Sequence, residues 1–432
     1  MLGAFANAFR TPDLRRKLLF VLGILVIFRA GSQLPTPGVH YENVQECFAQ
    51  IENEGLYGLI NLFSGGALLQ LTVFALGIMP YITASIILQL LVVVIPRLET
   101  LKKEGQAGQA KITQYTRYLT LGLAVLQATG IIALARSRNL FEGCNLPLLR
   151  DENSTLQFLI MVITMTAGTA VIMWFGEQIT ERGVGNGMSI LIFTQVVATF
   201  PSSLWQVRAQ QGWTIFGVVT AIGLVIIAAV IFIEQAQRRI PVQYARRMVG
   251  RKMFGGSSTY IPLKVNQAGI IPVIFASSLM YLPMMAAQFN QNSKSAWVDF
   301  ITTYFQDGGH PLYMAVYFAL IIFFTYFYVA ITFNPVEVAD NMKKYGGFIP
   351  GIRAGKPTED YLSYVLSRIT LPGALYLGLI SLIPLIAFVL IDANQNFPFG
   401  GTSILIMVGV ALDTVKQIES QLQQRNYEGF LR

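Results

Sequence analysis

Residues 214–233 read TIFGVVTAIGLVIIAAVIFI, a run that contains no charged residue. A helix that crosses the hydrocarbon core of a bilayer needs about 20 consecutive apolar residues, so this run predicts a transmembrane helix. The whole chain has the same character: of its 432 residues 53% are hydrophobic and 12% are charged, and the mean hydropathy is +0.53. Soluble domains carry roughly 25% charged residues. The composition excludes a soluble globule and a disordered chain, and it predicts an all-α integral membrane protein.

Ten apolar runs of this kind occur, and an even number of spans places both termini on one side of the membrane. The runs lie near residues 18–34, 73–95, 116–135, 156–175, 187–204, 214–233, 268–287, 313–333, 371–391 and 401–415. A further stretch, about 58–72, is too short and too interrupted by glycine to span. It predicts a re-entrant segment, which is tolerated at membrane depth only inside protein or beside water.

The run count divides the chain into an N-terminal half, 1–204, and a C-terminal half, 205–432. Each half would hold five spans, and an odd number forces the two halves into opposite orientations. This is the inverted-repeat layout, which places a pathway at the interface between the halves. The sequence shows no residue-level repeat, so this prediction rests on the count of spans.

Basic residues are distributed unequally between the two faces. Of the 31 Lys and Arg residues, 25 fall on the side of the N-terminus and 5 on the opposite side, which predicts cytoplasmic termini. Two cytoplasmic loops, 235–267 and 334–370, carry more basic charge than orientation requires. They are either solvated charge that touches anionic lipid, or a docking surface for an anionic partner such as ribosomal RNA or a motor.

The sequence lacks the residues that are characteristic of several classes of function. The interiors of the predicted spans contain no Asp, Glu, Lys or His, whereas ion-coupled carriers usually place such groups there. The chain has no GxxxxGKS/T phosphate loop, no HExxH and no GxSxG motif, and its two histidines are too few for a metal site. We therefore expect no catalytic residue, metal or cofactor. Cys47 and Cys144 form no disulfide framework, although they could pair on an oxidising face.

The spans do contain uncharged polar residues, which usually join helices by hydrogen bonds. Near them, Ile82 and Ile86 lie four residues apart and share one helical face. Rows of aliphatic residues mostly face lipid or the protein core. A collar of branched aliphatic side chains would alternatively close a pore to water and ions without binding them.

Five motifs resemble the SecY family, the central subunits of bacterial Sec protein-conducting channels. They are GIMPYITASII (77–87), ITERGVGNGMSI (179–190), IPLKVNQAGIIPVIFASS (261–278), NPVEVADNMKKYGGFIPGIR (334–353) and FGGTSILI (399–406). They extend from the second predicted span to the last, so the resemblance covers essentially the whole chain. Residues 417–432 are more similar to the cyanobacterial or plastid branch, which would allow a thylakoid as well as a plasma (inner) membrane location.

The resemblance implies ten transmembrane helices in two inverted five-helix halves, hinged between the fifth and sixth spans, with a re-entrant plug helix. Around the pore, the constriction ring would consist of Ile82, Ile86, Ile192, Ile274 and Ile406, with a contribution from Met188. The plug would include Phe63, Ser64, Gly65 and Gly66. The lateral gate, formed by the second and seventh spans, would carry Thr83, Gln89 and Asn266. Residues for docking a motor or ribosome would be Arg246, Arg247, Arg251, Lys252 and Arg353.

The implied function is a non-enzymatic channel that passes unfolded preproteins across the membrane and releases apolar segments sideways into lipid. The implied partners are the SecE and SecG subunits, the SecA ATPase, the ribosome, preprotein signal sequences and membrane lipids. A secondary transporter would instead need intramembrane ionisable groups, and an intramembrane enzyme would need a nucleophile–base pair or a metal site. The sequence shows neither.

Overall fold

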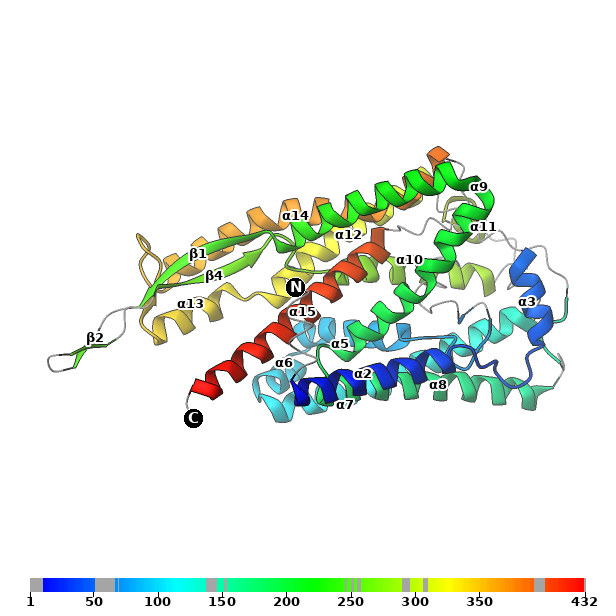
Figure 1. Ribbon diagram of the computed structural model, residues 1–432, viewed down its shortest axis with the longest axis horizontal. Coiled ribbons are helices and arrows are strands. Elements are labelled where there is room, and N and C mark those ends of the chain that lie inside the picture. The colour runs from blue at the N-terminus through cyan, green and yellow to red at the C-terminus, as the bar shows by residue number, and fades with distance from the viewer. Residues whose placement is uncertain are drawn as a thin grey trace.

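The computed structural model describes residues 11–50, 67–68, 70–136, 146–150, 154–244, 247–249, 252–254, 258–289, 296–305, 310–391 and 401–430, and most of them are helical (Figure 1). The helices are α2 (Pro12–Gly31), α3 (Tyr41–Gln50), α5 (Met79–Val94), α6 (Pro96–Lys103), α7 (Gln106–Arg136), α8 (Thr155–Arg182), α9 (Gly187–Gln235), α10 (Ile271–Phe289), α11 (Ala296–Phe305), α12 (Pro311–Thr332), α13 (Pro335–Lys344), α14 (Lys356–Ile391) and α15 (Gly401–Phe430). The strands are β1 (Gln237–Tyr244), β2 (Arg247–Val249), β3 (Lys252–Phe254), β4 (Ser258–Lys264) and β5 (Gly347–Phe348).

Two groups of long helices run side by side along the molecule (Figure 1). In the first group α7 contacts α5 and α8, and α2 contacts α8. In the second group α12 contacts α10 and α14. The first group comes from the predicted N-terminal half and the second from the C-terminal half. Helix α15 contacts both α9 and α14 and lies between the groups.

Helix α9 joins the two groups. It leaves the first group, turns at the end of the molecule where α3 and α11 lie, and returns along the second group (Figure 1). The turn contains Gly212, whose φ of 81° breaks the helical geometry. Glycine reaches this left-handed region without the steric cost of a Cβ atom. The break agrees with the predicted boundary between the runs 187–204 and 214–233.

Each of the ten predicted apolar runs lies largely on a described helix. Within the described residues, five helices are long and apolar enough to cross a membrane, or six if the bent pair Met79–Val94 and Pro96–Lys103 forms one span. The pair is bent by 100°. Two shorter apolar helices, Gly187–Pro201 and Ile271–Met280, accompany them. A helical membrane protein is thus confirmed, and the count of ten spans stays a prediction.

One end of the molecule, called the sheet end below, carries a small antiparallel sheet in the order β4-β1-β5. Its register pairs Ile240 with Ile261, and Gln243 with Phe348. The buried core beneath it draws on β1, β4, the 349–352 turn, α13 and α14. A separate hairpin, β2–β3, projects beyond this end (Figure 1). Residues 235–267 and 334–370 were predicted to be two separate loops, and neither sheet was expected.

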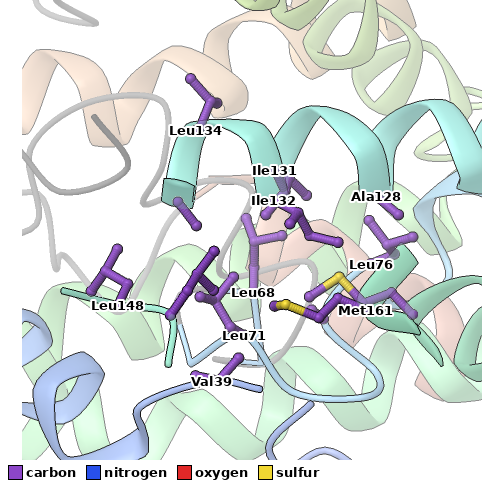
Figure 2. Close-up of a cluster of buried hydrophobic side chains, with 14 of the residues drawn as sticks. Val39, Leu68, Leu71, Leu76, Ala128, Ile131, Ile132, Leu134, Leu148 and Met161 are labelled. Carbon is purple, nitrogen blue, oxygen red and sulfur yellow. The ribbon is translucent and has the colours of Figure 1, made fainter. Parts of the chain in front are cut away.

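The opposite end, called the α3 end below, has its own apolar core. Figure 2 shows Leu68 and Leu71 between Val39 and the α7 side chains Ile131 and Ile132. Two isolated β-bridges, Pro35↔Thr72 and Val39↔Leu149, hold these segments together. The end of the predicted plug stretch, 58–72, is therefore anchored against α7 and the loop that follows α2.

Candidate functional site

An apolar cluster joins the two helix groups, and we call it the inter-half cluster. Its buried members are Val21, Ile24, Phe28, Phe74, Ile78, Ile172, Phe175, Ile179, Ile190, Leu191, Ile192, Val196 and Ile406. Ile406, from α15, belongs to the C-terminal half and the others belong to the N-terminal half. The side chains of this cluster are apolar, so they offer no charge that would hold an ion.

The structure brings three of the five predicted ring residues into this cluster. Ile192 and Ile406 are 8% and 1% exposed, and Ile82 and Met188 are partly buried against them. Ile86 and Ile274 are also buried, at 6% and 4%, but they are not members of the inter-half cluster. The isoleucines thus lie inside the protein rather than on its outer surface.

A glycine turn positions Ile192. Asn186 caps α9 by accepting a hydrogen bond from the Met188 amide at 3.1 Å, and Thr180 Oγ1 accepts one from the Gly187 amide at 2.9 Å. A Cβ atom at Gly187 would collide with the Gly176 carbonyl oxygen, so only glycine allows α8 and α9 to approach this closely. Residues 183–186 form the bend between α8 and α9, and α9 begins directly after it at Gly187.

The predicted plug residues Phe63, Ser64, Gly65 and Gly66 lie outside the described residues. The chain that follows them is described and firmly packed. The Thr36 amide donates to the Leu71 carbonyl at 3.1 Å, and the Val73 amide donates to the Leu34 carbonyl at 2.9 Å. Phe74 stacks on Phe28 of α2 with ring centroids 5.9 Å apart. The end of the plug stretch is thereby tied to the first span.

Helix α3 lies in the segment that follows α2 and carries two acidic residues. Val44 and Cys47 are fully buried on one face of the helix, while Glu42 and Glu46 are exposed on the other. Cys47 is disulfide-bonded. The one other cysteine of the chain is Cys144, which lies outside the described residues. The acids of α3 are thus the solvated face of an amphipathic helix, and the question of pairing that the sequence left open is resolved for Cys47.

The predicted gate residues are not brought together. Helix α10 contacts α5, as a gate between the seventh and second spans requires. Thr83 Oγ1, however, donates to the Met79 carbonyl of its own helix at 3.0 Å, and Gln89 is exposed. Asn266 is 3% exposed, and its Nδ2 donates to Glu234 Oε1 of α9 at 2.6 Å and to the Gly269 carbonyl at 3.2 Å.

Beside Asn266 lies a cavity of about 380 Å³ that sequence reasoning missed. Its lining comes from both halves: Asn186 and Ser189 at the start of α9, Glu234 at its end, and Asp413 on α15. Asn266 Oδ1 is buried there without a hydrogen-bond partner. The cavity joins segments that are far apart in sequence, so no local pattern could have revealed it.

An ion pair that the sequence did not reveal joins α7 to α8. Arg117 donates to both carboxylate oxygens of Glu177, at 2.7 and 2.9 Å. Such two-point contacts are the stronger and more directional kind of arginine–carboxylate pair. Both residues were placed at the ends of their spans, but their pairing depends on the packing of the two helices.

The basic loops form a single surface at the sheet end, because β5 of the second loop pairs with β1 of the first. Arg353 is exposed in the turn between Gly351 (φ 84°) and Gly355 (φ 105°), and its carbonyl accepts a hydrogen bond from Thr358 Oγ1 at 2.9 Å. Arg247 and Lys252 lie on strands of the β2–β3 hairpin. Arg246 and Arg251 lie outside the described residues.

The described residues hold no group of three or more His, Cys, Asp or Glu side chains arranged to bind a metal ion. The polar side chains of the cavity are amides, hydroxyls, two carboxylates and two lysines, with Lys264 Nζ 3.6 Å from Asp413 Oδ1. The cavity therefore offers hydrogen-bonding and charged groups to a polar chain or to water.

Comparison with known proteins agrees with this geometry. A family model described as SecY matches residues 72–415. The chain is 66% identical to the protein translocase subunit SecY of Streptomyces galbus and 60% identical to that of Mycobacterium bovis, with full coverage of both chains in each case. These relatives are actinobacterial, so the predicted likeness of residues 417–432 to the cyanobacterial or plastid branch is not supported.

Solved structures share the fold. A protein-conducting channel matches with a TM-score of 0.63 at 19% identity, covering 94% of this chain and 91% of that one. A Sec61 chain from a canine ribosome–channel complex matches with a TM-score of 0.61 at 18% identity, with the same coverage. The family match and the full-length relatives lead to one conclusion: the chain belongs to the SecY family of protein translocase subunits.

Proposed function

We propose that this chain forms the channel through which unfolded preproteins cross the membrane, and that apolar segments leave it sideways into lipid. The inter-half cluster carries this proposal. It is an uncharged, mostly aliphatic contact between two helix groups that one bent helix connects. Branched aliphatic side chains can close around a passing chain of any sequence, and they exclude ions because they offer no compensation for a lost hydration shell.

We assign the constriction to Ile82, Ile192 and Ile406, supported by Ile86 and Ile274 as the resemblance implies. The stretch at about 58–72 would be the plug. Leu68 and Leu71 support this assignment because they anchor its end in the α3-end core. A SecY structure with a TM-score of 0.62 to this chain has been described as having a plug domain that stabilises the closed channel and maintains a membrane seal.

Energy for transport would come from partners that dock on the sheet end. SecA and the ribosome are the partners that the family resemblance suggests, with SecE and SecG as companion subunits. The support here is physical: two basic loops share one sheet, and a hairpin projects from it. A basic surface of this kind attracts acidic proteins and RNA at long range.

Reconstitution would test the proposal. Proteoliposomes that contain the chain with SecE and SecG should import a preprotein into a protease-protected space when SecA and ATP are added. A secondary transporter would exchange small solutes and ignore the preprotein. Import of small solutes without any protection of the preprotein would contradict the proposed function.

The sheet end would face the cytoplasm of a bacterial plasma membrane, together with both termini. The excess of basic residues on this side supports that orientation. A cysteine at the exposed Thr259 should react with a membrane-impermeant maleimide only after the cells are permeabilised, whereas one at the exposed Arg150 should react in intact cells. Labelling of the Thr259 variant from outside would overturn the orientation.

Asn266 offers a test of the gate. Replacement by leucine makes the segment just before α10 more apolar. We therefore expect a closed gate that is more stable by about 1 kcal/mol, so that a more hydrophobic signal sequence is needed to open it. Insertion of model segments of graded hydrophobicity would measure this threshold.

The control uses the other partner of the same hydrogen bond, Glu234. Glu234→Leu removes the bond to Asn266 but leaves Asn266 in place. An unchanged threshold in Asn266→Leu would contradict the gate role. A full shift in Glu234→Leu would attribute the effect to the lost hydrogen bond between Glu234 and Asn266 rather than to the gate surface.

A further inference from the structure

Two tryptophans and one arginine meet at the bend of α9. The guanidinium carbon of Arg208 lies over the ring of Trp205 and over the ring of Trp213, 4.1 Å from each ring centroid. Trp205 precedes the bend at Gly212 and Trp213 follows it. Arg208 thus lies against both rings at the bend of α9, the helix that joins the two helix groups. We call these three side chains the bend cluster.

The bend cluster lies where a membrane surface is expected. It separates the apolar helix Gly187–Pro201 from the apolar span Gly212–Gln235. Trp205 and Trp213 are 63% and 68% exposed, although tryptophan is a large and mostly apolar residue. Tryptophan concentrates at the headgroup level of bilayers, where its ring rests against lipid chains and its N–H remains hydrated. Two such rings at the end of two apolar helices therefore indicate contact with lipid headgroups.

Arg208 supplies the charge that this level of the membrane would bind. A guanidinium has a planar edge of five N–H donors, which matches the oxygens of a phosphate group. Within the described residues, Arg208 has cation–π contacts to the two rings but no hydrogen bond or ion pair to any acceptor. Stacking covers the flat surface of the guanidinium and leaves the donors at its edge available for an outside acceptor.

We propose that the bend cluster binds the headgroup phosphate of a phospholipid, with Arg208 as the hydrogen-bond donor and the two indole rings as the walls of the site. The site goes beyond the transport function, since lipid binding here requires neither preprotein nor motor. Stacking on tryptophan also orients the arginine in advance, so a phosphate would meet an ordered donor rather than a mobile side chain. The bound lipid would hold the bend at Gly212 in the membrane surface.

The first test measures lipid retention. The complete purified complex, exchanged into detergent with added phosphatidylglycerol, would be analysed by native mass spectrometry. In Arg208→Gln we expect the population that retains phosphatidylglycerol to fall on the order of tenfold, because a charge-assisted contact to phosphate is lost. Arg208→Lys should show a smaller loss, because it keeps the charge but lacks the planar edge. The matched control is Arg150→Gln, which removes an exposed arginine at the same end of the molecule.

The second test measures the depth of the rings and does not depend on the arginine variants. The chain has four tryptophans, so Trp174→Phe with Trp297→Phe leaves fluorescence from the bend cluster alone. Phosphatidylglycerol brominated near the headgroup should quench it more strongly than lipid brominated deep in the chains. Equal lipid retention in Arg208→Gln and the wild type would overturn the proposal. So would equal losses in Arg208→Gln and Arg150→Gln, or fluorescence that headgroup-proximal bromine does not quench.

Discussion

Replacement of Arg353 by glutamate should lower SecA-driven export at least tenfold while the protein still assembles. Arg353 is exposed, and the described structure holds its turn through backbone contacts and glycine conformations rather than through its guanidinium. Substitution of such a surface side chain usually changes folding stability by less than about 0.5 kcal/mol. The reversed charge would instead repel an acidic partner, and a loss of about 1.4 kcal/mol in docking corresponds to tenfold weaker binding.

The control for Arg353 is Lys344→Glu. Lys344 is also exposed at the sheet end, on α13, and its reversal changes the net charge by the same amount. Export would be measured by protease protection of a preprotein in membrane vesicles, and assembly by copurification with SecE. Normal export in Arg353→Glu, or an equal loss in Lys344→Glu, would contradict a specific docking role for the 349–355 turn.

Replacement of Ile192 and Ile406 by glycine should make the resting channel leak ions. Both residues are buried in the inter-half cluster, one from each half. The change removes branched side chains from both sides of the closure, so water could enter the constriction and carry ions with it. We expect the resting conductance in planar bilayers to rise at least tenfold. This corresponds to a free-energy barrier to ion passage that is lower by about 1.4 kcal/mol.

Loss of packing alone could also make a protein leak, so a matched variant is required. Ile172 is 0% exposed and belongs to the same cluster, but it lies on α8 and is not a predicted ring residue. Large-to-small changes in a core cost about 2–5 kcal/mol, so Ile172→Gly should be destabilised as much as each ring variant. If Ile172→Gly leaks as strongly as the ring variants, the leak reflects instability and the ring assignment is wrong.

The sequence predicted the helical part of the fold well, because each membrane-spanning helix must be a continuous apolar run. The break in α9 was also predictable, since Gly212 lies in a polar interval between two such runs. The sheet at the sheet end was not predicted. The basic residues Arg238 and Arg239 dominate the pattern of β1, and its partner β5 lies about a hundred residues away in the second loop.

Less of the site could be predicted, because it too depends on contacts between segments that are far apart in sequence. Sequence motifs placed Ile192 and Ile406 in the pathway, and the structure packs them in one cluster. They also nominated Asn266 as a contact across the gate, whereas the described hydrogen bonds of its amide nitrogen go to Glu234 and Gly269. Partners of a polar side chain depend on which helices pack together, and apolar periodicity does not encode this.

The central claim is that a polypeptide passes between the two halves at the inter-half cluster. A photo-crosslinking amino acid at position 82, 192 or 406 should capture a preprotein stalled during SecA-driven import. The same probe at Val225, which is 69% exposed on a predicted span, should capture lipid and no preprotein. Preprotein crosslinks at all three ring positions and none at Val225 are the predicted result. Preprotein crosslinks at Val225, without any at positions 82, 192 and 406, would contradict the account.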